Sequence, residues 1–146
     1  VLEFGSGGST VFFLKRIANL LTFEHSNVWI EKLKPKLQTY DNWKINPVNY
    51  VSRETVQNAH EEYLKGLEAV RDNSLDLVLV DGRHRVECIR ASIPKVKKSG
   101  YIILDDSDRP EYSEAFELLT EWESFVISGY AYMSDFKTHS TAWKKP

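Results

Sequence analysis

The chain has a single cysteine, Cys88, so no disulfide can form within it. No apolar run approaches the roughly 20 residues that a membrane-spanning helix needs, and no secretory signal peptide is visible. A reducing, cytoplasmic location is therefore expected. The net charge of −2 provides no general attraction to nucleic acid or anionic lipid, so neither is an expected partner.

The remaining composition is that of a globular domain. Of the 146 residues, 42% are hydrophobic and 27% are charged, which is enough to bury one sizeable core and excludes a disordered chain. No internal repeat or low-complexity segment interrupts it. We expect one domain over residues 1–146. Because Val1 is not a methionine and already lies in a predicted strand, we also expect that an N-terminal segment is missing.

Apolar runs bounded by turn residues alternate with helical patterns, which predicts an α/β fold. We expect a doubly wound, Rossmann-like sheet that is mostly parallel, with an antiparallel C-terminal hairpin strand. The predicted strands are residues 1–4, 20–24, 48–52, 75–80, 100–104, 125–130 and 140–143. The predicted helices are residues 10–19, 27–33, 54–70, 86–96 and 111–123. Pro35 should end or disturb the second helix, and residues 36–47 are predicted to be irregular.

Polar clusters follow five of the predicted strands, at residues 5–10, 24–27, 52–54, 81–85 and 105–109. In an open parallel sheet, these strand ends lie along one edge, where ligands bind. Loops are polar in general, which is the plain alternative. An acid closes the second, fourth and fifth strands, however, and carboxylates crowded on one edge repel each other without a ligand or cation.

A glycine-rich turn, Gly5-Ser6-Gly7-Gly8, joins the first strand to the first helix. Such a turn lets the backbone approach a nucleotide or nucleoside closely and points helix N–H groups at it. A dinucleotide fingerprint needs glycine at the first, third and sixth positions, but the sixth position here is Thr10. Glu24, at the end of the second strand, could accept hydrogen bonds from both ribose hydroxyls or could be a solvated strand-end residue.

At these motifs the chain resembles the class I S-adenosylmethionine-dependent methyltransferases. Residues 3–10 are similar to the acid-x-Gly-x-Gly motif of that family, residues 23–26 to its ribose-binding strand end, and residues 76–84 to its fourth motif. The departure is Ser9, where many members carry a third glycine. The resemblance implies a single S-adenosylmethionine-binding methyltransferase-like domain, with Glu3 either ordering the turn or binding the amino group through water. The implied cofactor-binding residues are Glu3, Gly5, Ser6, Gly7, Gly8, Ser9, Thr10, Glu24 and His25.

Three carboxylates close the fourth and fifth strands: Asp81, Asp105 and Asp106. The arrangement is similar to the metal sites of catechol-type O-methyltransferases and cephalosporin-hydroxylase-like methyltransferases. The resemblance implies a Mg²⁺ ion that would hold a substrate hydroxyl and lower its pKa. Alternatively, one of the two adjacent aspartates caps a turn or the following helix.

Asp81 and His84 are the predicted catalytic residues. His84 lies at the offset from Asp81 where catechol-type relatives carry a lysine base, and its ordinary pKa suits proton removal near neutrality. It could instead be an exposed loop residue. Arg83 and Arg85 could bind an anionic substrate or pair with the local aspartates, and the adenine contact could involve Ser52, Arg53 or side chains near Asp81.

The predicted function is methyl transfer from S-adenosylmethionine to a small hydroxylated molecule. The alternatives are a nicotinamide (NAD)-dependent oxidoreductase and a non-catalytic Rossmann-like module that binds a nucleoside ligand or a partner protein. A homo-oligomer is a further expectation.

Overall fold

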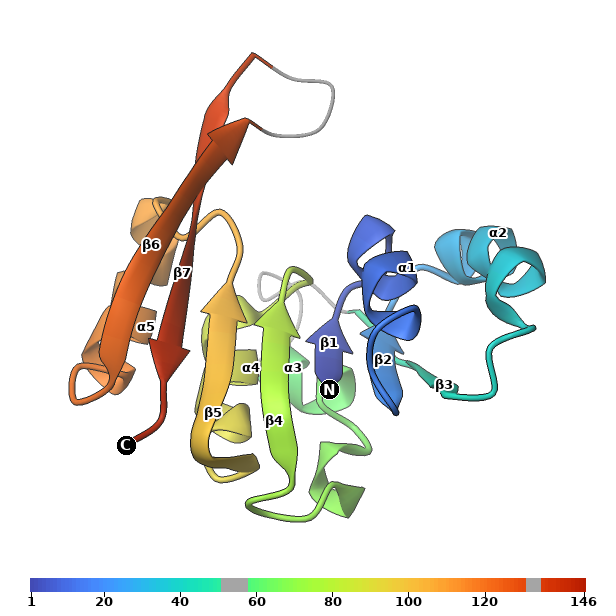
Figure 1. Cartoon of the computed structure of the whole chain (residues 1–146), viewed down its shortest axis with the longest axis horizontal. Coiled ribbons are helices and arrows are strands. Elements are labelled where there is room, and N and C mark those ends of the chain that lie inside the picture. Colours follow the sequence, from blue (N-terminus) through green and yellow to red (C-terminus); the bar gives the residue numbers. More distant parts are fainter. Residues whose placement is uncertain (51–57, 131–134) are drawn as a thin grey trace.

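The structure, a computed structural model, describes residues 1–50, 58–130 and 135–146. Figure 1 shows the chain in colours that follow the sequence. The strands are β1 (Leu2–Phe4), β2 (Leu20–Glu24), β3 (Trp43–Pro47), β4 (Leu75–Val80), β5 (Val96–Leu104), β6 (Glu123–Tyr130) and β7 (Lys137–Lys144). The helices are α1 (Gly8–Leu14), α2 (Asn27–Leu37), α3 (Ala59–Tyr63), α4 (Arg85–Ser92) and α5 (Ser113–Leu118), with short 3₁₀ turns at Leu67–Ala69 and Pro110–Tyr112.

All these strands form one seven-stranded sheet in the order β3-β2-β1-β4-β5-β7-β6. The first five strands in this order are parallel, β7 is antiparallel to β5, and β6 pairs antiparallel with β7. The predicted Rossmann-like fold with a C-terminal antiparallel hairpin is confirmed (Figure 1). The strand order reverses at β1, so the turn after β1 lies where open α/β sheets bind their ligands.

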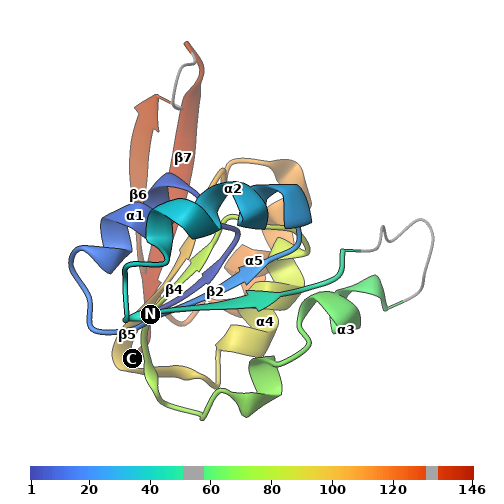
Figure 2. The same cartoon turned by 90° about the vertical axis from the view of Figure 1, so that its right-hand side faces the viewer.

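Helices cover both faces of the sheet (Figure 2). On one face, α1 and α2 pack through Phe13, Leu14, Leu33 and Leu37. On the other face, the core includes Val78 and Val80 of β4 and Cys88 and Ile89 of α4, all fully buried. Because both faces are covered, β4 is almost wholly apolar, as its sequence indicates. No helix in the described parts of the chain is long and apolar enough to cross a bilayer.

The third strand is not where the sequence analysis placed it. β3 occupies Trp43–Pro47, within the stretch predicted to be irregular, and residues 48–50 are not a strand. Residues 51 and 52 of the predicted strand lie outside the described residues. β3 is an edge strand that pairs only with β2, so solvated Lys44 and partly exposed Asn46 interrupt the apolar pattern by which a buried strand is recognised.

Several helices also differ in length from the prediction. α2 continues past Pro35 to Leu37, because buried Leu33 and Leu37 hold its last turn against the core. α1 ends at Leu14 instead of residue 19. The predicted helix over residues 54–70 is broken at Gly66, whose φ is +95°, and residues 54–57 lie outside the described ranges.

The bounds of the later helices and strands also differ from the prediction. α4 ends at Ser92, two residues before Pro94, and β5 begins at Val96 instead of residue 100. α5 covers residues 113–118 of the predicted 111–123, whereas β6 and β7 are longer than predicted. The carboxyl ends of β1, β2, β4 and β5 nevertheless fall at the predicted residues, and these ends carry the site.

Candidate functional site

The glycine turn fits closely against the end of β4. Gly5 has a φ of +91°, and a Cβ atom there would lie 2.9 Å from the Asp81 carbonyl oxygen, so this position requires glycine. Gly7 and Gly8 differ, because a Cβ atom at either would meet nothing within 4 Å. The turn is therefore tightly packed at its base and open above Gly7 and Gly8.

Glu3 holds this turn from inside the fold. Its fully buried carboxylate accepts hydrogen bonds from the hydroxyls of Thr10 at 2.6 Å, Thr22 at 2.7 Å and Ser9 at 3.1 Å. The Thr10 hydroxyl also accepts the N–H of Gly7 at 2.9 Å. Burial raises the pKa of Glu3. Glu3 thus orders the turn and presents no surface to the solvent.

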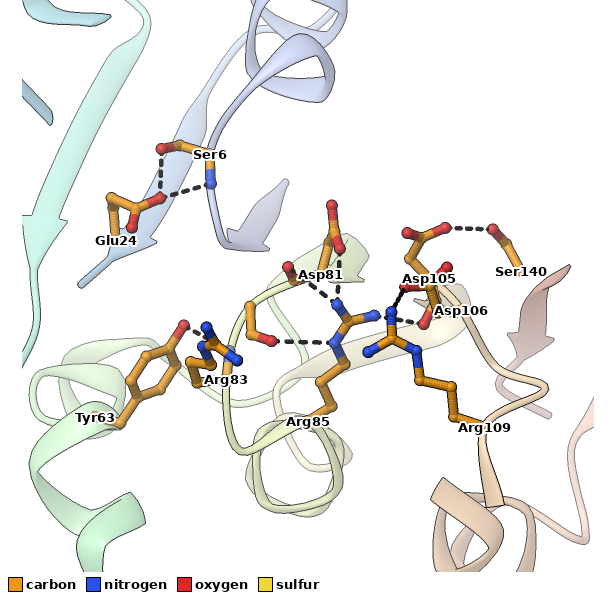
Figure 3. A network of polar contacts seen from close by, with 11 residues as sticks. Ser6, Glu24, Tyr63, Asp81, Arg83, Arg85, Asp105, Asp106, Arg109 and Ser140 are labelled. Carbon is orange, nitrogen blue, oxygen red and sulfur yellow. Dashed lines mark hydrogen bonds and ion pairs between the residues drawn. The ribbon is translucent and has the colours of Figure 1, made fainter. Parts of the chain in front are cut away.

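Glu24 lies directly beside the turn, as Figure 3 shows. One carboxylate oxygen accepts the backbone N–H of Ser6 at 2.9 Å and its hydroxyl at 2.6 Å, while the other accepts the N–H of Ser26 at 2.8 Å. A carboxylate has about four lone-pair sites, so one acceptor position remains for a ligand. The indole N–H of Trp29 donates to the Ser6 carbonyl at 2.6 Å and fixes the turn from the side of α2.

The neighbouring His25 is neutral near pH 7, because burial lowers its pKa. Its Nδ1 atom lies 3.2 Å from a Glu24 oxygen but makes no aligned hydrogen bond. The ring packs edge-on against Tyr50, with ring centroids 5.4 Å apart. His25 therefore forms part of the wall beside Glu24 and adds no positive charge to it.

A hollow of about 450 Å³ joins the glycine turn to the ends of β4 and β5. Its lining residues are Gly5, Ser6, Glu24, His25, Ser26, Trp29, Asp81, Gly82, Arg83, Arg85 and Arg109. A larger hollow of about 590 Å³ lies at the opposite edge of the sheet, beside Val1, Leu20, Trp43 and Leu75. None of the predicted site residues lines that larger hollow, so we place the functional site in the smaller one.

Arg85 ties the ends of β4 and β5 together (Figure 3). Its buried guanidinium donates to the carbonyl of Gly82 at 3.0 Å, to the carbonyl of Asp105 at 2.6 Å and to Oδ1 of Asp81 at 3.0 Å. The sequence analysis left Arg85 open between substrate binding and pairing with an aspartate, and the geometry shows the pairing. Asp81 lies in the loop before α4, which begins at Arg85, so helical spacing offered no signal for this pairing.

Asp81 is the most perturbed carboxylate of the hollow. Its pKa is raised to about 6, mainly by desolvation at the strand ends; the nearby charge of Arg85 opposes the rise, and those of Asp105 and Asp106 add to it. Its side chain is still 47% exposed. Asp81 can therefore exchange a proton with a molecule in the hollow close to neutral pH.

The three aspartates do not form the predicted magnesium site. Asp81 pairs with Arg85, Asp105 accepts the hydroxyl of Ser140 at 2.7 Å, and Asp106 pairs with Arg109. Within residues 1–50, 58–130 and 135–146, no three Asp, Glu, His or Cys side chains are placed to hold a metal. The residues present do not fit the ion, because two guanidinium groups already offset the charge that a cation would neutralise.

His84 is neither an exposed loop residue nor part of the lining of the hollow. It is 9% exposed, begins α4 with a φ of +49°, and packs its ring near Tyr50, Tyr63 and His60 at centroid distances of 5.4, 5.6 and 6.5 Å. Tyr63 was not among the predicted site residues. Its hydroxyl accepts the N–H of Arg83 at 3.1 Å and so holds the loop after β4.

Two expected adenine contacts, Ser52 and Arg53, lie outside the described residues. With the geometry established, comparison with known proteins identifies the family. The methyltransferase-domain family matches residues 2–107, which is most of the chain. The chain belongs to this family. This finding confirms the predicted methyltransferase class over the oxidoreductase alternative, and membership of the family implies S-adenosylmethionine as the methyl donor.

Solved structures agree on the fold. The O-methyltransferase TomG from Streptomyces achromogenes, in complex with S-adenosylmethionine, superposes with a TM-score of 0.73 at 15% identity, covering 99% of this chain and 72% of TomG. An O-methyltransferase from Bacillus cereus gives 0.75 at 12% identity, covering 99% and 73%. Spermidine synthase from Thermotoga maritima gives 0.67 at 19% identity, and the chain spans only 52% of its length. A search of the curated proteins finds no match.

Proposed function

We propose that this methyltransferase domain transfers a methyl group from S-adenosylmethionine to a hydroxyl of a small molecule. The observation that carries the proposal is the hollow of about 450 Å³, which joins the glycine turn and Glu24 to Asp81. When bound, S-adenosylmethionine supplies an electrophilic methyl group on a positively charged sulfur. The chain needs to bind the two molecules, align them and remove one proton.

The residues of the turn fit the cofactor. The open space above Gly7 and Gly8 admits a ligand to the backbone, and the remaining lone pair of Glu24 can accept a ribose hydroxyl. Rotation of the Ser6 hydroxyl away from Glu24 would free a second acceptor position. Because Glu3 and Trp29 hold the turn in its present shape, little ordering remains to oppose binding.

Asp81 is the proposed general base. It lines the hollow, its side chain is half exposed, and Arg85 holds one of its oxygens. When S-adenosylmethionine is bound, Asp81 would take the hydroxyl proton of the acceptor, whose oxygen would receive the methyl group. The geometry favours Asp81 over His84 as the base, because the His84 ring packs near Tyr50 and Tyr63. Among the described residues, it gives no support to a step through Mg²⁺.

Two measurements test this proposal. Calorimetry with S-adenosylhomocysteine reports cofactor binding, and transfer of a labelled methyl group to a panel of hydroxylated compounds reports turnover. Asp81→Asn should lower turnover about 100-fold or more and leave S-adenosylhomocysteine affinity unchanged. Asp108→Asn is the matched control, because Asp108 is exposed and does not line the hollow.

The outcomes separate the two parts of the proposal. A chain that does not bind S-adenosylhomocysteine contradicts the proposed cofactor site. A chain that binds it, but whose Asp81→Asn variant turns over like the unmodified protein, contradicts the role of Asp81 alone.

A further inference from the structure

The wall of the hollow carries more positive than negative side chains. Three guanidinium groups, those of Arg83, Arg85 and Arg109, face two carboxylates, those of Glu24 and Asp81. His25 contributes no charge near pH 7 because burial lowers its pKa. At the ends of β4 and β5, the three guanidinium groups lie near three carboxylates, those of Asp81, Asp105 and Asp106, and two of these carboxylates are paired with Arg85 and Arg109.

The three arginines differ in how far the protein itself uses them. Arg85 is buried and directs its guanidinium to two carbonyls and to Asp81, so it is a structural tie. Arg109 is 49% exposed and pairs with Asp106 through one nitrogen, which leaves further N–H donors. Arg83 is exposed and has no ion pair among the described residues.

Arg83 is nevertheless held in place. Its guanidinium lies 5.3 Å from the centroid of the Tyr50 ring, and its backbone N–H is fixed by the Tyr63 hydroxyl. A guanidinium over an aromatic face keeps its in-plane N–H donors available for a planar or tetrahedral anion. Figure 3 shows Arg83 and Arg109 on either side of Arg85, at the rim of the Asp81 strand end.

The rest of the lining offers little to an apolar molecule. Among the residues that the structure describes, Trp29 is the only large apolar side chain that lines the hollow, and its indole N–H is engaged with the Ser6 carbonyl. These described residues offer no apolar wall next to Asp81 to a flat hydrocarbon acceptor. The wall matches a polar molecule with negative charge.

We infer that the methyl acceptor carries an anionic oxygen group, a carboxylate or a phosphate, and that Arg83 and Arg109 bind it beside Asp81. This inference rests on the proposed function and deepens it by defining the class of acceptor. The guanidinium groups supply the positive charge near the acceptor that the sequence analysis had assigned to a metal. They bind the charged group of the acceptor and leave its hydroxyl to Asp81.

The test uses sets of related hydroxylated compounds, in which one member lacks an anionic group and the others carry a carboxylate or a phosphate. Calorimetry in the presence of saturating S-adenosylhomocysteine compares glycerol with glycerate and glycerol 3-phosphate, and catechol with 3,4-dihydroxybenzoate. We expect the charged member of each set to bind at least about tenfold more tightly than the neutral one. The order of glycerate and glycerol 3-phosphate then distinguishes a carboxylate site from a phosphate site.

Variants assign the effect to the two arginines. Arg83→Gln and Arg109→Gln should each weaken the binding of the charged compound about tenfold, and Arg83→Lys should restore part of the loss. Arg90→Gln is the matched control, because Arg90 is an exposed arginine that pairs with Glu114 and does not line the hollow. S-adenosylhomocysteine affinity should be unchanged in all four variants.

Equal affinity for charged and neutral compounds, or charged-compound affinity that survives both glutamine substitutions, overturns the inference. If S-adenosylhomocysteine still binds in that case, the proposed function stands. If S-adenosylhomocysteine does not bind but the arginine-dependent preference for anions persists, the anion site stands and the proposed cofactor site fails.

Discussion

Asp81 should titrate near pH 6 in the folded protein, well above its ordinary value of 3.8. Desolvation is the largest cause, and the neighbouring carboxylates act in the same direction against Arg85. Two substitutions should therefore move the pKa in opposite directions. Asp105→Asn removes a negative neighbour and lowers the pKa of Asp81, whereas Arg85→Gln removes the compensating cation and raises it.

The same shift has a consequence for stability. Because the folded pKa lies above the unfolded one, the stabilising contribution is complete below pH 3.8 and is lost as the pH rises through about 6. A change from 3.8 to 6 corresponds to about 3 kcal/mol in full, and we reduce this to about 1–2 kcal/mol because the side chain is half exposed to screening solvent. Relative to Asp81→Asn, the unmodified chain should lose that amount between pH 4 and pH 7.

Carbon-13 NMR of the aspartate carboxyl groups, assigned through the Asp81→Asn spectrum, measures the pKa directly. Urea unfolding at pH 4 and pH 7 measures the stability difference. The Asp105→Asn variant keeps the test decisive if Arg85→Gln does not fold. A titration of Asp81 near pH 4, or a rise in its pKa in Asp105→Asn, would refute the electrostatic reasoning.

Four further predictions concern the turn and the metal. Gly5→Ala should lower the free energy of unfolding by about 1–3 kcal/mol in urea, because its φ is positive and its Cβ would crowd Asp81. Gly7→Arg should fold normally yet lose S-adenosylhomocysteine binding in calorimetry; a folded variant that still binds would contradict the cofactor site. Glu24→Gln should weaken that binding about tenfold, and unchanged affinity would count against a ribose contact. Incubation with EDTA should leave turnover unchanged, and a loss restored by Mg²⁺ would show that the aspartates rearrange around an ion.

The strands that the sequence predicted best are those that pair with a neighbouring strand on both sides. β2 and β4 have the predicted bounds, because a strand that pairs with two neighbours is mostly apolar, and a polar residue marks its end. β3 pairs on one side only, and its partly exposed side chains carry no such run. Residues 43–47 form a strand because they pair with β2, which is distant along the chain. A local sequence pattern carries no information about such pairing.

The site shows the same division between local and distant information. The sequence motif predicted that Glu24 lies near the glycine turn. In the structure, Glu24 accepts hydrogen bonds from the backbone and the hydroxyl of Ser6 in that turn. Spacing along the chain could not show that Arg85 faces the Asp105 carbonyl, twenty residues away on another strand end. The magnesium prediction treated three aspartates as if they had no closer partners, but Asp81 pairs with Arg85, Asp106 pairs with Arg109, and Asp105 accepts the hydroxyl of Ser140.

The choice between a metal ion and a guanidinium at these strand ends changes what the site can do before any ligand binds. A metal would leave the aspartates in mutual repulsion whenever it dissociates. Arg85 belongs to the chain, so it ties the ends of β4 and β5 together without a bound ion, and it holds one oxygen of Asp81. Glu3 and Trp29 order the glycine turn in the same built-in way. The hollow between these two regions is therefore preorganised by buried side chains of the protein itself, and affinity for S-adenosylhomocysteine should not depend on divalent cations.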